Sequence, residues 1–265
     1  MSDPNYSGGG RLSVVVPVYN EEGTITNVIE RLRRVPFLLE IIVVDDCSTD
    51  KTPRLLHQLA NEYSELTIIR HEKNKGKTAA LKTGFRQTRG EIVIVQDADL
   101  EYDPSEIGAL IQPIVDGHAD VVYGSRFLVR KATRVLYFYH YLANKSITLF
   151  SNLLTNVNLT DVETGYKAFR GDIIRNMIVT SRGFGFEIEV TAKVAKLGCA
   201  MFEVPISYYG RTYEEGKKIS ARDGLYALWY IARYNWLTSL RQSYRTLPQT
   251  PLRPVPERMV QKAAK

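Results

Sequence analysis

Two pairs of carboxylates, each directly after an apolar run, are the residues with the clearest chemical potential. Asp97 and Asp99 follow the run at 91–95, and Asp45 and Asp46 follow the run at 40–44. Carboxylates one residue apart repel each other, and a hard cation with oxygen ligands relieves that repulsion. Mg²⁺ commonly takes one or two carboxylates and completes its shell with phosphate oxygens and water. Asp97, Asp99 and the nearby Glu101 therefore predict a metal–diphosphate site, with an exposed acidic turn as the alternative.

The other strand-end groups allow two interpretations each. Asp45 and Asp46 can accept hydrogen bonds from a base or a ribose, or can form a helix-capping turn with Ser48. Lys77 closes a Lys/Gly loop at 73–77 and has the reach to contact a phosphate, although most such loops are solvated turns. The chain has neither the GxxxxGK[ST] spacing nor a GxGxxG after its first strand, which disfavours a P-loop enzyme and a dinucleotide dehydrogenase.

Alternating strands and helices are expected to position these groups. The patterns predict strands and helices in turn, at 12–18 (strand), 24–35 (helix), 40–44 (strand), 51–63 (helix), 66–70 (strand), 78–88 (helix), 91–95 (strand), 104–115 (helix) and 119–123 (strand). This order indicates an α/β fold with a mostly parallel sheet flanked by helices. Ligands of such sheets bind beyond the carboxyl ends of the strands. We therefore expect Tyr19, Asp46, the lysine loop and Asp97 to gather at one edge.

Composition limits the class of protein. The chain has 265 residues, 35 Lys and Arg against 29 Asp and Glu, and a net charge of +6, which suits an anionic partner. Two distant cysteines and no CxxC pair argue against a thiolate zinc site and against a disulfide framework. No apolar run is long enough to span a membrane and no signal peptide is visible. We expect a flexible N-terminus at 1–11, one catalytic domain at 12–240 and a flexible basic tail at 241–265.

The middle of the chain has an unusual charge pattern. Residues 121–160 contain no Asp or Glu but carry five Lys and Arg, interleaved with aromatic residues. A helix at 135–154 and another at 221–240 are rich in Tyr, Trp, Phe and Leu. Aromatic residues mixed with basic ones suit a membrane interface, and core helices packed on the sheet are the alternative.

A family resemblance unites these features. Eight segments of the chain are VVVPVYNEE (14–22), VVDDCSTD (43–50), NKGKTAALKTGF (74–85), QDADLEYDP (96–104), YGSRF (123–127), NLLTNVNLTDVETGYKAFR (152–170), GFGFEIEV (183–190) and YYGRTYEEGKKI (208–219). They resemble family 2 glycosyltransferases with the GT-A fold, most closely the dolichol- or polyprenyl-phosphate hexosyltransferases. The resemblance covers about 12–238. It implies a nucleotide half at about 12–125 and an acceptor half at about 126–240, with C-terminal amphipathic helices.

The resemblance also implies roles for individual residues. The nucleotide sugar would be bound by Pro17, Tyr19, Asn20, Glu21, Asp46, Lys77, Asp97, Ala98 and Asp99. Asp97 and Asp99 match the DxD motif that binds Mg²⁺ or Mn²⁺, and Glu101 would be a third ligand. Arg126 would contact phosphate, and Arg211 and Lys217 would close over the diphosphate. Some mannosyltransferase relatives place Arg and Ser where His140 and Asn144 stand, so the acceptor-phosphate contact departs from the pattern here.

The implied reaction is inverting transfer of a hexose from a nucleotide sugar, GDP-mannose or UDP-glucose, to a polyprenyl or dolichyl phosphate. Such an enzyme is expected at the cytoplasmic face of a membrane as a peripheral protein, with a membrane-anchoring subunit as a possible partner. A hydroxyl acceptor on a saccharide is the alternative; it would need a carboxylate base, for which Asp161, then Glu163 and Glu187, are candidates. A nucleic-acid-binding protein is disfavoured, because no binding motif is present and the carboxylates would repel a phosphate backbone.

Overall fold

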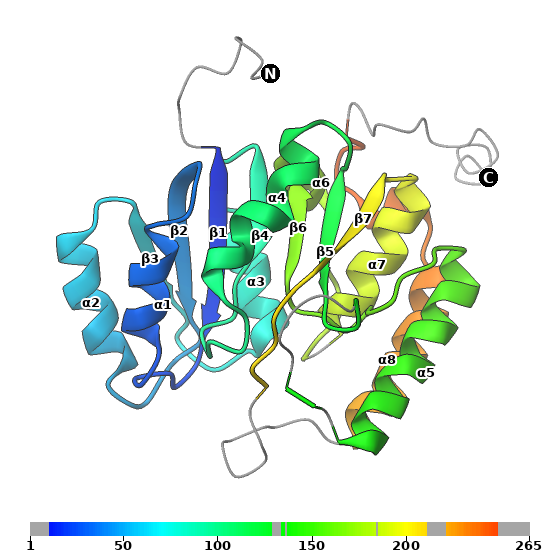
Figure 1. Ribbon diagram of the computed structural model, residues 1–265, viewed down its shortest axis with the longest axis horizontal. Helices are drawn as coiled ribbons and strands as arrows, with labels where there is room; N and C mark the ends of the chain where they lie inside the picture. The colour runs from blue at the N-terminus through cyan, green and yellow to red at the C-terminus, as the bar shows by residue number, and fades with distance from the viewer. Residues whose placement is uncertain (1–10, 129–133, 136, 184, 211–220, 249–265) are drawn as a thin grey trace.

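The described residues of the computed structural model form one seven-stranded sheet with helices on both faces (Figure 1). The structure describes residues 11–128, 134–135, 137–183, 185–210 and 221–248. The strand order is β3-β2-β1-β4-β6-β5-β7. The strands are β1 (Leu12–Val18), β2 (Leu38–Asp45), β3 (Leu66–Arg70), β4 (Ile92–Val95), β5 (Val121–Ser125), β6 (Lys167–Arg170) and β7 (Met201–Pro205).

The sheet is mostly parallel, as predicted. β1 pairs in parallel with β2 and β4, β2 with β3, and β5 with β7. The exception is β6, which runs antiparallel to β4 and to β5 and was not predicted. The carboxyl ends of β1, β2 and β4 therefore meet at one edge, whereas β6 runs through the sheet in the opposite direction.

The helices begin and end close to the predicted positions where their pattern is strongly periodic. They are α1 (Ile25–Leu32), α2 (Thr52–Glu62), α3 (Lys77–Phe85), a 3₁₀ turn η1 (Pro104–Glu106), α4 (Ile107–Val115), α5 (Phe138–Thr155), α6 (Gly171–Asn176), α7 (Phe186–Leu197), α8 (Ala221–Trp236) and α9 (Leu240–Ser243). The helix predicted at 104–115 thus consists of η1 followed by α4. The helix predicted at 221–240 ends at Trp236, and a separate short α9 follows.

The hydrophobic core has two layers because side chains alternate along each strand. Val14 and Val16 of β1 face a layer that includes Ile29 of α1 and Leu110 of α4. Val15 faces the opposite layer, which includes Phe85 of α3 and Phe186 of α7. Gly84 lets α3 approach β1, since a Cβ there would lie 2.4 Å from Cγ1 of Val15. Burial of both sheet faces fixes α3 and α4 against the strands whose ends carry the polar groups.

The packed domain extends past residue 240, where the flexible tail was predicted to begin. Ser243 and Tyr244 are buried, and Tyr244 forms an antiparallel bridge with Met177. The backbone N–H of Arg245 donates to the carbonyl of Asn176 at 2.8 Å. Residues 241–248 thus pack against the segment after α6, and residues 249–265 lie outside the described residues.

Candidate functional site

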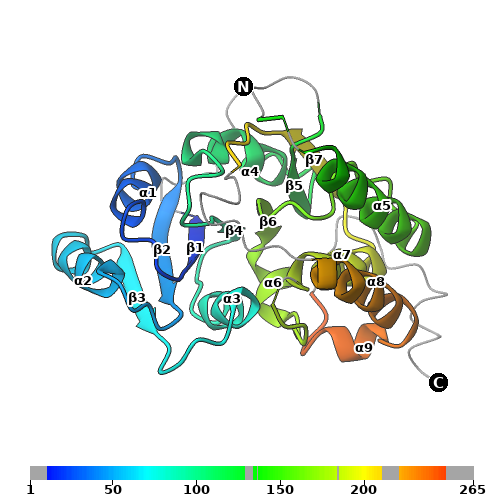
Figure 2. The same cartoon turned by 90° about the horizontal axis from the view of Figure 1, so that it is seen from below.

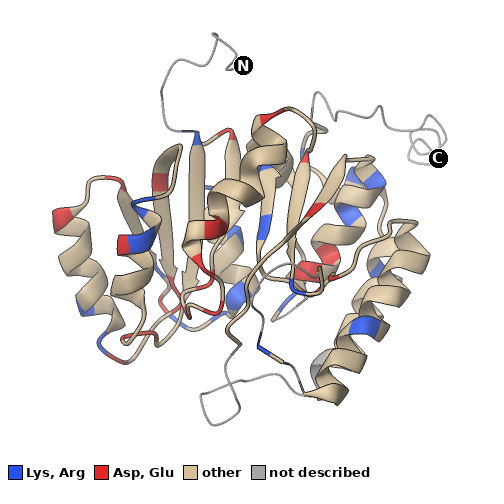
Figure 3. Cartoon of the chain, viewed as in Figure 1, with Lys and Arg blue, Asp and Glu red and all other residues tan. Residues whose placement is uncertain are grey.

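The polar groups that follow the parallel strands meet at one edge of the sheet, as predicted. The Asn20 backbone N–H, after β1, donates to Oγ of Ser48, after β2, at 3.0 Å. The Lys75 backbone N–H, before α3, donates to the Asp46 carboxylate at 3.0 Å. Lys77 Nζ reaches Asp97, after β4, at 2.8 Å. Figure 3 shows acidic residues gathered below the carboxyl ends of these strands.

The residues predicted to line a nucleotide pocket lie at the end of β1. Pro17 is half-buried within the strand and pairs with Val44 of β2. Asn20 adopts a left-handed conformation with φ of 55°, and its Oδ1 accepts from the Thr49 backbone N–H at 2.8 Å. Glu21 accepts from the Thr24 hydroxyl at 2.8 Å. Tyr19, which lies between Pro17 and Asn20 in the sequence, is half-buried. This turn is therefore held by hydrogen bonds to the segment after β2.

The Asp46 carboxylate is occupied by groups of the chain itself. It accepts from the backbone N–H groups of Lys75 and Gly76, at 3.0 and 2.6 Å, and lies 2.6 Å from Nδ1 of His71. Asp45 is bonded by the Ser48 backbone N–H at 2.9 Å and lies 3.3 Å from Arg70 Nε. Asp46 thus fixes the Lys/Gly loop in place, and its predicted contact with a nucleotide base stays a prediction.

Asp97 and Asp99 lie just after β4, and Lys77, the first residue of α3, contacts Asp97. Lys77 Nζ contacts both carboxylate oxygens of Asp97, at 2.8 and 2.9 Å, and lies 3.5 Å from Glu187. Burial alone would lower the pKa of Lys77, but the Asp97 and Glu187 carboxylates raise it above its usual value. Burial, reinforced by the charge of Asp97, raises the pKa of Asp99 to about 7.

Asp97 and Asp99 are suited to bind a divalent cation, whereas Glu101 is less suited to be its third ligand. Both present only oxygen donors, and a hard cation between them would offset the cost of a buried second negative charge. Glu101 instead accepts a hydrogen bond from the Tyr208 hydroxyl at 2.9 Å. Within the described residues no three acidic, His or Cys side chains lie where they could hold one ion. The structure therefore does not assemble the predicted three-carboxylate ligand set.

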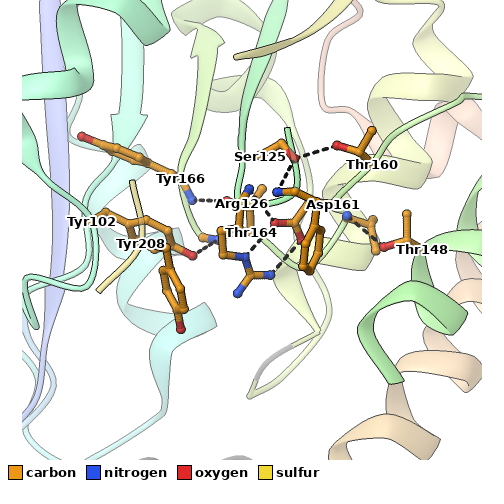
Figure 4. Close-up of polar contacts among 12 residues, drawn as sticks. Tyr102, Ser125, Arg126, Thr148, Thr160, Asp161, Thr164, Tyr166 and Tyr208 are labelled. Atoms are coloured by element: carbon orange, nitrogen blue, oxygen red, sulfur yellow. Dashed lines mark hydrogen bonds and ion pairs between the residues drawn. The ribbon is translucent and has the colours of Figure 1, made fainter. Parts of the chain in front are cut away.

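Arg126, at the end of β5, is bound by Asp161 in a two-pronged ion pair (Figure 4). Its Nε and Nη2 donate to the two carboxylate oxygens at 2.7 and 2.8 Å, and its backbone N–H donates to the same group at 3.2 Å. Asp161 is fully buried. Burial opposes the charge on Arg126, but the Asp161 carboxylate raises the pKa of the guanidinium well above its usual value. Asp161 is thereby committed to holding Arg126, which does not suit a catalytic base.

One short loop joins the carboxylate pair to the arginine. The loop at 160–166 contains Asp161, beside Arg126, and Gly165, whose backbone N–H donates to the Tyr102 hydroxyl at 3.1 Å. A Cβ at Gly165 would lie 2.7 Å from Oδ2 of Asp97 and 3.3 Å from Lys77 Nζ. The rings of Tyr102 and Tyr208 lie 5.5 Å apart, and Tyr208 lies 5.2 Å from the Arg126 guanidinium. The carboxylates and Arg126 are therefore parts of one site.

Two further carboxyl groups lie behind this loop. Burial and the neighbouring Glu187 carboxylate raise the pKa of Glu163 to about 7. Oε1 of Glu163 and Oε2 of Glu187 are buried and have no hydrogen-bond partner among the described residues. Lys167, fully buried beside them, donates to the Val162 carbonyl at 3.0 Å. Burial lowers the pKa of Lys167 to about 8 although the acidic neighbours oppose it.

His140 and Asn144 lie on α5, one turn apart, and the structure does not join them to Arg126. In the described part of the chain the hydrogen bonds of Arg126 all go to Asp161. On α5, Tyr141 and Lys145 pack on the Phe127 ring, with the Tyr141 ring centroid at 5.5 Å and Lys145 Nζ at 4.2 Å from its centroid. Lys145 also donates to the Thr160 carbonyl at 3.1 Å. The predicted Arg211 and Lys217 fall outside the described residues.

Sequence reasoning singled out neither Tyr102 nor Tyr208, although both border Arg126 and Asp97. Both lay inside quoted motifs, but a tyrosine gives no charge pattern, and its role depends on which groups the fold places beside it. The contact of Glu187 with Lys77 was also unforeseen, because the two residues are 110 positions apart in the sequence.

Helices α5 and α8 pack side by side and leave large apolar side chains in solvent. Thr148 and Ser151 of α5 are buried, but Tyr139 is 79% and Leu153 67% exposed; on α8, Leu225 is 71% and Trp236 70% exposed. These positions are therefore not core positions. No helix of the described residues is both long and apolar enough to cross a membrane.

Comparisons with known proteins agree on the family. The model of the family described as glycosyl transferase family 2 matches residues 13–178. A polyprenol monophosphomannose synthase of Mycolicibacterium smegmatis is 31% identical over 208 residues, which are 76% of this chain and 78% of that protein. An undecaprenyl-phosphate mannosyltransferase of Micrococcus luteus is 30% identical over 213 residues, 78% of this chain and 87% of that protein.

A similar solved structure supports the fold. Glucosyl-3-phosphoglycerate synthase from Mycobacterium tuberculosis, in complex with Mn²⁺, uridine-diphosphate and phosphoglyceric acid, has a TM-score of 0.66 and 21% identity, and the match covers 86% of this chain and 79% of that one. At this identity the likeness concerns the fold alone. With a sheet of this topology, a family model matched over most of the sheet and relatives at 30% identity or more, the chain belongs to glycosyl transferase family 2 and is a glycosyltransferase.

Proposed function

We propose that this glycosyltransferase moves a hexose from a nucleotide sugar to the phosphate of a polyprenyl or dolichyl lipid, with inversion at the anomeric carbon. GDP-mannose is the favoured donor, because the relatives at about 30% identity are named for mannose transfer to polyprenyl phosphates. UDP-glucose is the alternative donor, since the structural neighbour was solved with uridine-diphosphate.

The observation that carries the proposal is the buried guanidinium of Arg126 beside the Asp97 and Asp99 pair. Arg126 is pre-oriented by Asp161, and its third nitrogen forms no hydrogen bond to the described residues. A guanidinium held in this way is suited to grip a phosphate, because its planar donors match phosphate oxygens. A basic group prepared for an anion, a few residues of loop away from a diphosphate site, favours a phosphate acceptor.

The acceptor chemistry needs no strong base. A phosphate monoester has a second pKa near 6 and is already an oxyanion at neutral pH. Its oxygen forms the new bond to the anomeric carbon while the bond to the nucleoside diphosphate breaks. In this proposal Arg126, with Lys145 nearby on α5, holds the nucleophile, and the absence of acidic residues from 121–160 keeps repulsion away from it.

The donor half has a complementary task. In this proposal Asp97 and Asp99 hold Mg²⁺ or Mn²⁺, which when bound neutralises charge on the departing diphosphate. Lys77 orients Asp97 through its ion pair, and the Tyr208 hydroxyl donates to the Glu101 carboxylate. The turn at Tyr19, Asn20 and Glu21 and the loop fixed by Asp46 would frame the nucleoside. Arg211 and Lys217 would add positive charge at the diphosphate.

The exposed apolar faces of α5 and α8 support action at a membrane surface. Figure 3 shows no acidic residue on α5, so this face would meet anionic lipid without repulsion. Aromatic side chains next to basic ones are favoured at the boundary between head groups and acyl chains. We place the protein at the cytoplasmic face as a peripheral protein, where a membrane-anchoring subunit could add to the attachment.

A saccharide or other hydroxyl acceptor is the second candidate, and one observation favours it. A hydroxyl nucleophile needs a base, and Glu163 has a buried, unpartnered oxygen and a pKa raised to about 7. The two functions are separated by an assay that supplies either a polyprenyl phosphate or a soluble saccharide with each nucleotide sugar.

The first measurement is calorimetric binding of GDP, UDP and CDP with and without Mn²⁺, followed by a transfer assay. Metal-dependent preference for GDP, with mannose transferred to polyprenyl phosphate, is the expected result. Preference for UDP would replace mannose by glucose on the same lipid. Transfer only to soluble saccharides would contradict the lipid proposal, and no metal-dependent binding of any nucleotide would contradict the assignment of Asp97 and Asp99.

A further inference from the structure

A cavity lined by positive charge lies away from the Asp97–Arg126 site, between α3 and the segment that follows α6. Figure 2 shows α3 and α6 side by side at this place. The cavity has a volume of about 530 Å³. We call it the basic cavity, because six of its lining residues are cationic and none is acidic: Lys75, Lys82, Arg86, Arg175, Arg182 and Arg245.

Two walls from distant parts of the chain bring these charges together. Lys75, Ala79, Lys82 and Arg86 recur every three or four residues and so share one side of α3 and its flanks. The opposite wall comes from 174–182 and from Arg245, which the Met177–Tyr244 bridge holds in place. The second wall begins about 90 residues after the first in the sequence, so the convergence is a property of the tertiary structure.

Among the residues that the structure describes, these six cationic side chains have no carboxylate partner. Within the described residues none of the six forms an ion pair, and Arg175 donates to the Gly90 carbonyl at 2.7 Å. Two acidic residues near the second wall are paired with other cations: Asp172 with Arg170 and Glu189 with Lys193. Like charges around a concave surface raise its potential and attract anions.

The second wall is fixed in advance of any ligand. Glu189, fully buried, accepts from the backbone N–H groups of Thr180 and Ser181 at 2.8 and 2.7 Å. The floor is apolar and includes Phe85, Ile174, Met177 and Val179. The Ser181 hydroxyl also lines the cavity and has no hydrogen-bond partner among the described residues. A cavity of this size, with apolar floor and polar rim, has the dimensions of a small-molecule site.

We propose that the basic cavity binds a small ligand carrying several phosphate charges, at a site distinct from the Asp97–Arg126 site. The shared chemistry is a cluster of phosphate oxygens, whether on a soluble phosphorylated molecule or on a phosphorylated lipid head group. Lys75 makes the cavity a neighbour of the strand-end site, because its side chain lines the cavity while its backbone N–H is bound to Asp46. The proposal does not depend on which sugar or acceptor the enzyme uses.

The test is calorimetric titration of the full chain with inorganic tripolyphosphate in EDTA, which keeps divalent cations from bridging the probe to Asp97 and Asp99. The variant Lys82→Ala/Arg86→Ala is expected to weaken binding about tenfold or more, since two charge-assisted contacts to the phosphate oxygens are lost. Ala79→Trp fills the cavity without changing charge and is expected to remove binding. Arg54→Ala, an exposed α2 charge, and Arg126→Ala are expected to leave the affinity unchanged.

A vesicle arm separates the two sources of phosphate. Pelleting with phosphatidylcholine vesicles that contain phosphatidate, lost in Lys82→Ala/Arg86→Ala, together with weak tripolyphosphate binding, would assign the cavity to a lipid head group. Tight tripolyphosphate binding without vesicle binding would assign it to a soluble ligand. Tripolyphosphate binding that survives both cavity variants, or that only Arg126→Ala removes, would overturn the proposal, as would no binding of either probe. Thermal melting of each variant checks that it is folded.

Discussion

At the scale of single residues, the site is built from cations already held by carboxylates. Asp161 holds Arg126 and Asp97 holds Lys77, each across fewer than 3 Å. Such pairs fix the direction of a charge before the substrate arrives, which is how a site stabilises charge without reorganising. The same pairing makes the residues hard to replace, because removal of one partner leaves the other charge buried and alone.

Replacing Arg126 by Lys keeps the positive charge but removes the planar guanidinium with its several N–H donors. We expect Arg126→Lys to lower kcat/KM for polyprenyl phosphate about 100-fold, since an ammonium cannot bind both Asp161 and a phosphate in the same geometry. The dissociation constant of the nucleotide sugar is expected to stay within about threefold. Steady-state kinetics and calorimetry measure both. A variant that loses donor affinity while it keeps acceptor affinity would show that Arg126 serves the donor.

A bound cation is expected to offset the electrostatic cost of the buried Asp99 carboxylate. Asp99→Ala is expected to abolish turnover because the metal and diphosphate lose a ligand, and to raise thermal stability slightly because a buried charge disappears. EDTA is expected to abolish activity of the parent protein, with recovery on addition of Mn²⁺. Activity assays in Mn²⁺ and thermal melting in EDTA are the measurements. An Asp99→Ala variant with full activity would contradict the metal site.

Glu163 separates the two candidate acceptors. With a phosphate acceptor, Glu163→Gln is expected to change kcat less than about threefold, because the nucleophile is already ionised. With a hydroxyl acceptor, loss of the base is expected to cost about 100-fold or more. Single-turnover rates with each acceptor decide between them, and Asp161→Asn, which disturbs Arg126, serves as the comparison that slows both reactions.

At the scale of elements, the antiparallel strand β6 determines how the loop at 160–166 enters the site. Because β6 lies between β4 and β5 and runs against them, the chain just before it crosses the edge where Asp97 and Arg126 stand. Gly165 is the point of closest approach, and Tyr102 ties its backbone to the segment after β4. The loop therefore lies between Asp97 and Arg126.

Gly165 is accordingly sensitive to a single methyl group. Gly165→Ala would bring Cβ to 2.7 Å from Oδ2 of Asp97, so the carboxylate or the loop must move. We expect kcat/KM to fall about tenfold or more, since small misplacements of catalytic groups are costly, while the melting temperature falls only a few degrees. Gly224→Ala on α8, where a Cβ meets nothing within 4 Å, is the matched control. Unchanged activity of Gly165→Ala would show that the loop yields freely.

At the scale of the whole molecule, the helix pair α5 and α8 combines exposed apolar side chains with contacts from α5 to Phe127, next to Arg126. The two helices pack on each other and on α7 rather than on the sheet, so one side of each stays exposed (Figure 2). A lipid-phosphate acceptor could then approach Arg126 from the membrane while the donor site remains in water. This arrangement would let one protein use an acceptor in the membrane and a donor in water.

Membrane binding is expected to depend on that face. Phe150→Ser/Leu153→Ser is expected to reduce the vesicle partition coefficient about tenfold or more, because each apolar side chain withdrawn from water contributes about 1–3 kcal/mol. Co-sedimentation with anionic vesicles measures the effect. Phe37→Ser, which changes an exposed apolar residue before β2, is the control. Equal loss in both variants would mean that general hydrophobicity, not the α5 face, binds the vesicles.

The amino-acid sequence alone predicted the elements whose hydrophobic period is strong and local. The parallel strands β1 to β4 and helices α1 to α4 lie within a few residues of their predicted positions, because buried strands and turn residues can be recognised in short stretches of sequence. The groups that follow the strands lie at one edge, as parallel strands require. The motifs also identified the family, which the comparisons confirmed. The buried Ser243 and Tyr244 lie within the range predicted as a tail, because two buried residues in a short segment leave no periodic pattern.

Only the tertiary structure decided which charges face each other. The direction of β6, the ion pair of Asp161 with Arg126, the contact of Glu187 with Lys77 and the hydrogen bond from Tyr208 to Glu101 all depend on residues far apart in the chain. The basic cavity has the same origin, because its walls come from separate segments. Sequence periodicity reports which side of an element is buried, whereas the pairing of charges across elements depends on packing, because Coulomb interactions depend on distance in space and not on distance along the chain.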